Sequence, residues 1–194
     1  MPNFFLTRRS LLAAGIGSVF PATTAGAKVH PTNAWPVFGN AQGKVTIVEF
    51  FEYQCPNCKR LHPQLEALVK EHGSIRLIMK DWPIFGETSV YASRMALAAH
   101  YSGAYEKAFH ALMTVPGRLT MKRIDETLRA SGIDTDRVRD GLEQHFDAIQ
   151  GILDENAAEA KDLQLAGTPA FIVGKKLYPR VTDIDTIRAA VEHS

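Results

Sequence analysis

The sequence is poor in cysteine, in net charge and in long apolar runs. It has only two cysteines in 194 residues, which excludes a framework of structural disulfides. Its 22 basic and 21 acidic side chains nearly cancel, so the chain has no global positive field to hold nucleic acid or an anionic membrane. With 45% apolar and 22% charged residues, it has the composition of a soluble globular domain that can bury a core without disulfides. We therefore predict no nucleic-acid partner and expect the function to depend on local chemistry.

The first 27 residues have the pattern of an export signal. Arg8 and Arg9 precede an apolar run over residues 11–20, and small residues end at Ala27. The run is about half of the ~20 residues that a membrane-spanning helix needs, so a permanent anchor is the weaker interpretation. The paired arginines resemble a twin-arginine signal, and a general secretory signal fits them equally well. We predict cleavage after Ala27 and export to the periplasm, an oxidising compartment.

Residues 28–86 carry the pattern of a β-α-β unit. An extended lead-in with a short strand or turn precedes Val45–Phe51, whose β-branched and aromatic side chains are typical of a strand buried on both faces. A helix is predicted from the cysteines to His72, where Gly73 ends it. Residues 75–79 form the second predicted strand. A right-handed crossover makes the two strands parallel.

The rest of the chain divides into a helical segment and a return to the sheet. Residues 87–166 have a helical pattern, broken at three Ser-Gly or Pro-Gly pairs, which predicts a helical insertion. Residues 167–194 contain a predicted strand at 170–173, a hairpin and a last helix. For that helix, Thr182 followed by Asp185 three positions later indicates a capping box.

The two cysteines form a Cys-Pro-Asn-Cys motif where the first helix is predicted to begin. Pro56 fits the first helical position, where its missing N–H costs nothing, and this places Cys55 at or near the N-cap. The unpaired N–H groups of Asn57 and Cys58, together with the helix dipole, favour the Cys55 thiolate and lower its pKa. Because Cys58 lies one turn further on the same face, the pair can close a disulfide. We predict that Cys55 is the exposed, attacking sulfur and that Cys58 resolves the mixed disulfide.

An inert buried pair and half of a metal site are the alternatives to a redox pair. A zinc site needs four ligands, and the seven histidines show no paired ligand spacing. Lys59 directly after Cys58 excludes the haem-attachment motif, which requires histidine there. We therefore predict no metal site.

Two further features have alternative interpretations. Glu49 stands in the apolar strand, where it is either an exposed edge residue or a buried carboxylate with a raised pKa that relays a proton to or from Cys58. Thr168 and Pro169 precede the third predicted strand as an ordinary turn or as a cis-proline loop packed beside Cys55. In the second case the Thr168 backbone is free to pair with an extended substrate. The residues alone leave both choices open.

Together these features resemble the DsbA-like exported thiol:disulfide oxidoreductases of the thioredoxin superfamily. The resemblance rests on residues 48–58, which include Glu49 at the position of a buried acid, on Pro63 within the helix, and on the cis-proline loop pattern of residues 167–171. It implies an α/β thioredoxin fold with a mixed central sheet. The first part of this fold is residues 28–86 and the second part is residues 167–194. Residues 87–166 form an all-helical subdomain inserted between them.

The activity that the resemblance implies is disulfide donation to unfolded exported proteins with thiols. A membrane quinone reductase of the DsbB or vitamin K epoxide reductase type would reoxidise the protein, and no bound cofactor is needed. The implied catalytic residues are Cys55, Cys58 and Glu49. The implied substrate-binding residues are Thr168, Pro169, Pro56 and Asn57.

Two departures from the best-known oxidases leave the direction of transfer open. Pro-Asn stands between the cysteines where those oxidases have Pro-His, so the oxidising power is expected to be milder. Thr168 resembles the isomerase and reductase branches as much as the oxidases. The alternative enzyme is therefore a disulfide reductase or isomerase kept reduced by a membrane donor, and the alternative outside enzymes is a non-catalytic chaperone or copper carrier.

The lead-in of residues 28–44 is too short for the dimerisation domain of isomerase relatives, so we expect a monomer.

Overall fold

A computed structural model of the chain describes residues 36–180 and 183–194. The predicted export signal, residues 1–27, and Thr182 lie outside these residues. The described strands are β1 Val37–Gly39, β2 Val45–Phe51, β3 Ile75–Asp81, β4 Ala170–Val173 and β5 Lys176–Tyr178. The described helices are α1 Pro56–His72, α2 Glu87–His100, α3 Tyr105–Met113, α4 Met121–Ala130, α5 Thr135–Gln144, α6 Phe146–Asp162 and α7 Ile184–Glu192.

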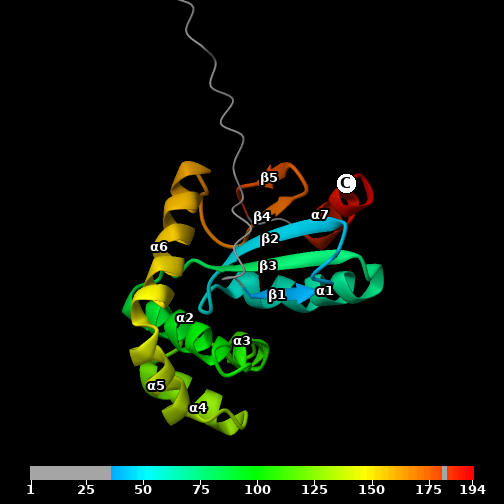
Figure 1. The fold of residues 1–194 in the computed structure, drawn as a ribbon. Helices are drawn as coiled ribbons and strands as arrows, with labels where there is room; N and C mark the ends of the chain where they lie inside the picture. Colours follow the sequence, from blue (N-terminus) through cyan, green and yellow to red (C-terminus); the bar gives the residue numbers. More distant parts are fainter. Residues whose placement is uncertain (1–35, 181–182) are drawn as a thin grey trace, which may run out of the picture. The chain divides into compact units, whose positions relative to one another are not determined.

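The strands form one mixed sheet in the order β1-β3-β2-β4-β5 (Figure 1). The two central strands, β2 and β3, run parallel, as the β-α-β pattern predicts, whereas β1, β4 and β5 are each antiparallel to their neighbours. Strand β3 extends two residues beyond the prediction because Lys80 and Asp81 continue the pairing with β2. These polar residues are buried because α6 supplies partners: Glu159 binds Lys80, and the Asn156 side chain donates to the Asp81 carbonyl.

Helix α1 covers the face of the sheet to which the Glu49 side chain belongs. Successive side chains of a strand point to opposite faces, so Ile47, Glu49 and Phe51 of β2 share one face. Ile47 and Phe51 belong to the same buried core as Leu61 and Leu65 of α1. Helix α1 therefore covers the face on which Glu49 lies, and α7 packs beside α1.

The helical insertion is confirmed as α2 to α6, the green to gold helices that group together in Figure 1. Helices α2, α3 and α4 end near the three predicted breaks, whereas the boundary between α5 and α6 at His145 was not predicted. At the three predicted breaks, Gly103, Gly117 and Gly132 have φ angles of 72°, 72° and 71°. Glycine adopts this left-handed conformation without the penalty that a Cβ brings. Phe109 of α3 joins the insertion to the rest of the core, since its ring centroid lies 5.1 Å from that of Phe51. No helix among the described residues is both long and apolar enough to cross a membrane.

The predicted start of the last helix is wrong by one residue. The N-cap of α7 is Asp183, whose carboxylate accepts a hydrogen bond of 2.8 Å from the N–H of Thr186. An aspartate at this position satisfies a free N–H of the first turn by itself, so the capping box of Thr182 and Asp185 is not needed.

Candidate active site

The sequence builds the site by ending β2 and starting α1 within a few residues. Pro56 is the first residue of α1, and Cys55, with extended backbone angles, is its N-cap. The Cys55 sulfur accepts a hydrogen bond of 3.2 Å from the N–H of Cys58. The predicted placement of both residues is confirmed, and the sulfur occupies the position that a capping side-chain oxygen usually takes.

This position stabilises a negative charge on Cys55. Its pKa is lowered from 9.0 to about 6, first because the Cys58 thiol donates a hydrogen bond to its sulfur. Burial opposes the shift, and hydrogen bonds from the N–H groups of Cys58 and Asn57 support it. Near neutral pH, Cys55 is therefore mainly a thiolate, the form that attacks disulfides.

The second sulfur has the opposite property. Cys58 is fully buried, and its pKa lies well above 9.0 because of burial, its hydrogen bond to Cys55 and the negative charge of Glu49. The two sulfurs therefore differ in protonation at the same pH. Such a difference in pKa between neighbouring titratable groups is typical of a catalytic pair whose two members have different roles.

The loop before β4 lies against the first sulfur. The peptide bond between Thr168 and Pro169 is cis, and the Cys55 thiol contacts the Thr168 carbonyl oxygen at 3.3 Å. Of the two interpretations of this loop, the cis-proline loop beside Cys55 is thus the one that the structure has.

The prediction that Cys55 is exposed is wrong, because the residue is only 2% exposed. The Thr168 loop covers its sulfur from one side, and the first turn of α1 covers it from the other. Pro56 and Asn57, directly after Cys55, are exposed. They are the surface next to the sulfur that an incoming chain can contact.

Glu49 is a buried carboxylate and not an exposed edge residue. It is 0% exposed, and neither of its carboxylate oxygens has a hydrogen-bond partner within the described part of the chain. Burial raises its pKa from 4.5 to about 8, and the negative charges of Cys55 and Glu66 add to the shift. The carboxyl group therefore holds a proton at neutral pH.

Two polar residues between β2 and Cys55 belong to the site, although the sequence motifs did not indicate them. Glu52 is also fully buried; it accepts a hydrogen bond from the Gln54 N–H, and burial raises its pKa. The Gln54 side chain donates to the Ser89 hydroxyl at 2.8 Å and accepts from the Leu119 N–H at 3.1 Å. These bonds fix the insertion to the turn that carries Cys55. The available signal was the presence of polar residues where an apolar strand meets the cysteine motif.

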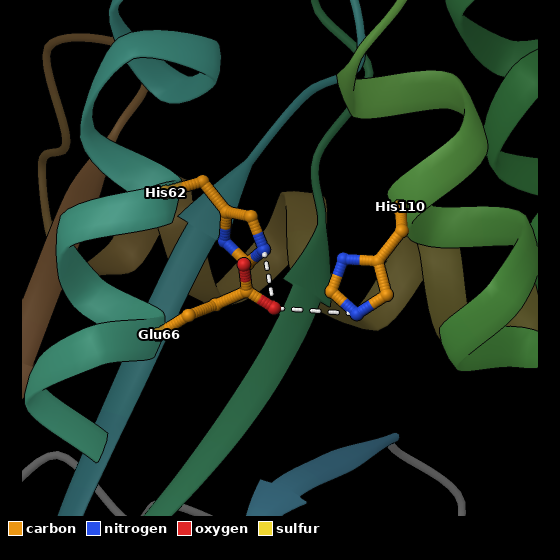
Figure 2. Close-up of side chains that lie close together, drawn as sticks. All are labelled: His62, Glu66 and His110. Atoms are coloured by element: carbon orange, nitrogen blue, oxygen red, sulfur yellow. Dashed lines mark ion pairs between the residues drawn. The ribbon is translucent and has the colours of Figure 1, made fainter. Parts of the chain in front are cut away.

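A second cluster of titratable side chains lies further along α1 (Figure 2). His62 and Glu66 come from α1, and His110 comes from α3. A Glu66 carboxylate oxygen lies 3.4 Å from Nε2 of His62 and 3.2 Å from Nε2 of His110. Burial, followed by the charge of His110, lowers the pKa of His62 to about 4. The histidines thus come together in space although their spacing in the sequence shows no pairing.

The fold and the site define a class of protein. A parallel β-α-β unit with Cys55 as N-cap, Cys58 one turn on and a cis-proline loop against the first sulfur is the arrangement of a thiol:disulfide oxidoreductase of the thioredoxin fold. Residues 46–192 match the family described as DSBA-like thioredoxin domain. The chain therefore belongs to that family of oxidoreductases.

Individual relatives agree with this assignment. The chain is 30% identical over 173 residues to the thiol:disulfide interchange protein DsbA of Burkholderia cepacia, covering 85% of this chain and 80% of that one. A thioredoxin-like oxidoreductase from Silicibacter pomeroyi is 34% identical with a TM-score of 0.79, covering 84% of this chain and 92% of that one. A periplasmic thioredoxin-like protein from Salmonella enterica serovar Typhimurium is 28% identical with a TM-score of 0.74, covering 86% and 93%.

Proposed function

We propose that the protein is a periplasmic oxidase that donates the Cys55–Cys58 disulfide to exported proteins. A substrate thiolate attacks the Cys55 sulfur, forms a mixed disulfide and releases Cys58. The second substrate thiolate then attacks the substrate sulfur of the mixed disulfide and releases Cys55 as a thiolate. Two electrons pass from the substrate dithiol to the cysteine pair, and the substrate gains a disulfide.

The observation that carries this proposal is the position of the Cys55 sulfur at the N-cap of α1, 3.2 Å from the Cys58 backbone nitrogen, which lowers the pKa of Cys55. It makes Cys55 a good leaving group in the second step, because thiols of lower pKa leave faster. It also stabilises the reduced pair. At pH 7, a pKa of about 6 in place of 9.0 favours the reduced form about tenfold, which makes the pair more oxidising by about 30 mV.

Glu49 supplies the proton that the first step needs. When the substrate displaces Cys58, a thiolate forms at a buried position where its pKa lies well above 9.0. Glu49, with a pKa of about 8, is protonated at pH 7 and faces the same side of the sheet as α1. Transfer of its proton to Cys58 avoids a buried thiolate.

The substrate segment would bind across the exposed Pro56 and Asn57 and along the loop of Thr168 and Pro169. The Thr168 carbonyl already contacts Cys55. An extended substrate would therefore pair with the backbone N–H of Thr168 and lie as a strand added to the sheet. Backbone pairing does not depend on the substrate's side chains, which suits a donor that acts on many unfolded proteins.

A membrane protein of the DsbB or vitamin K epoxide reductase type would reoxidise the pair, and the chain would act as a monomer. The periplasmic location is supported by the signal-like pattern of residues 1–27 and by the Salmonella relative described as periplasmic.

The size of the same pKa shift favours a second candidate, a disulfide reductase or isomerase that a membrane donor keeps reduced. A Cys55 pKa of about 6 is closer to the value of ~7 in thioredoxin, a reductant, than to ~3.5 in the strong oxidant DsbA. The expected midpoint potential therefore lies between the two.

The redox state of the pair in growing cells distinguishes the candidates. Cells are quenched with acid, free thiols are alkylated with a reagent of high mass, and the two forms are separated by electrophoresis. A mainly oxidised pair supports the oxidase, and a mainly reduced pair supports the reductase or isomerase. The double variant Cys55→Ser, Cys58→Ser is the control, and full support of disulfide formation by that variant would instead indicate a non-catalytic chaperone or copper carrier.

A further inference from the structure

The cluster on α1 and α3 has the donor set of a transition-metal site. His62 and Glu66 are four residues apart on one helix, which places them on the same face, and His110 approaches from α3. Their ligand atoms all lie within 4.8 Å of one another. Figure 2 shows the Glu66 carboxylate between the two imidazole rings. The cluster shares no residue with the cysteine pair.

His62 is the observation that points to a ligand here. Its side chain is 4% exposed, and neither ring nitrogen makes a hydrogen bond to any residue that the structure describes. The contact with Glu66 is close but lacks hydrogen-bond geometry. A buried polar group without a partner destabilises the fold, and most buried groups of this kind are satisfied by protein, water or an ion. A cation between His62 and Glu66 would provide the missing partner.

We propose that His62, Glu66 and His110 bind a divalent transition-metal ion, for which Zn²⁺ is the best match. Two imidazoles and one carboxylate are a donor set found at zinc sites that keep an open position. With bonds of about 2.0–2.2 Å, neighbouring ligands of a tetrahedral ion lie about 3.4 Å apart. The two distances from Glu66, 3.4 and 3.2 Å, match this spacing.

The surroundings provide a further carboxylate and a path of entry. A Glu106 carboxylate oxygen lies 3.7 Å from Nε2 of His110, and Glu106 and Glu66 both line a surface cavity of about 460 Å³. An ion entering through this cavity meets two carboxylates first. His110 has a side-chain exposure of 36%, so its ring can adjust towards His62, while the ring of Phe38 stacked on it limits the range of that adjustment.

The test is calorimetric titration of the full chain with ZnCl₂ after the cysteine pair has been oxidised to the disulfide, so that no thiolate competes for zinc. We expect one Zn²⁺ per chain. The variants His110→Gln and Glu66→Gln should each weaken binding at least tenfold. Both side chains are partly exposed, so both variants should fold. Exposed His100 on α2 supplies the matched control, and His100→Gln should leave the affinity within twofold.

Two further measurements make the result decisive. Zn²⁺ should raise the unfolding temperature of the unaltered chain and not that of His110→Gln. Co²⁺ should give the visible absorption of a tetrahedral site, and Mg²⁺, which prefers oxygen ligands in octahedral geometry, should not displace it. Absence of saturable binding below about 100 μM Zn²⁺, or equal binding by the two variants and the unaltered chain, would overturn the proposal. Neither outcome bears on thiol exchange, which is measured separately.

Discussion

Helix α1 carries two clusters of reactive side chains, and they differ in how the chain assembles them. The cysteine pair lies within its first turn, and most of the groups that lower the Cys55 pKa belong to the next three residues. The cluster of His62 and Glu66, further along the same helix, is completed by His110 of α3. A local motif thus builds the first cluster, whereas the second exists only because the insertion packs against α1.

The clusters also differ in the charge that burial permits. At the N-terminus of α1, free N–H groups and a thiol donor offset the cost of burial, so the ionised form of Cys55 is favoured. In the middle of the helix the backbone N–H groups are already bonded. There burial lowers the pKa of His62 and disfavours its charged form. The same helix therefore stabilises an anion at its start and excludes a cationic imidazole further on.

The largest expected effect is loss of exchange when the local cluster is broken. Cys55→Ser should reduce disulfide donation to a reduced test protein to background, a loss of at least ~10³-fold, because Cys58 alone cannot form the disulfide that is donated. The matched variant Cys58→Ser keeps the attacking thiolate and should accumulate mixed disulfides through Cys55, visible as adducts on non-reducing gels. Adducts formed instead by Cys55→Ser would reverse the roles of the two sulfurs.

Burial raises the pKa of Glu49, and the negative charges of Cys55 and Glu66, one from each cluster, raise it further. With a native pKa of about 8 against 4.5, its contribution to stability is full below pH 4.5 and is lost as pH rises through about 8. Glu49→Gln cannot ionise, so it should be more stable than the unaltered chain by up to about 3 kcal/mol at pH 7, with no gain near pH 4. Urea unfolding at the two pH values measures this.

The same Glu49→Gln variant should exchange disulfides more slowly, because the proton for Cys58 is missing. Glu143, an exposed carboxylate on α5, provides the control. Glu143→Gln should change stability by less than about 0.5 kcal/mol at either pH. A Glu49→Gln variant with an equal gain at pH 4 and pH 7 would show that the carboxyl group is not protonated as we infer.

The pH dependence of the midpoint potential tests whether the N-terminus of α1 lowers the pKa of Cys55. Thiolate absorbance at 240 nm in the reduced protein should titrate with a midpoint near pH 6. Each proton taken up with two electrons contributes about 30 mV per pH unit. The midpoint potential should therefore change by about 60 mV per unit below pH 6 and by about 30 mV per unit above it. A single slope of about 60 mV per unit up to pH 8 would contradict the lowered pKa of Cys55.

The smallest expected effect comes from changing the exposed residue between the cysteines. Asn57→His adds a group that can carry a positive charge beside the thiolate. It should lower the Cys55 pKa further and raise the midpoint potential by about 30 mV, a tenfold change in the equilibrium. Asn57→Gln retains the neutral amide and should leave the potential unchanged. Equilibration with glutathione buffers measures both variants.

Features that neighbouring residues determine were predicted correctly from the sequence, whereas features that depend on distant segments were not. The predicted strand Val45–Phe51 and the predicted helix end at His72 are correct to the residue. The strand is determined by its own apolar side chains, and the helix end by the left-handed Gly73 directly after it. The lengthening of β3 to Asp81 was missed because its polar end is buried by partners on α6, far along the chain. The exposure of Cys55 was predicted wrongly because the loop that covers it follows more than a hundred positions later.

The amino-acid sequence by itself determined the position of the two sulfurs at the start of a helix and hence the class of chemistry, since a proline and free backbone N–H groups act on their nearest neighbours. Only the tertiary structure decided that Glu49 is buried beneath α1, that Thr168 lies against Cys55, and that the His62, Glu66 and His110 side chains meet. The reason is physical: helix capping is a property of a few consecutive residues, whereas burial and side-chain clusters depend on which distant segments pack together.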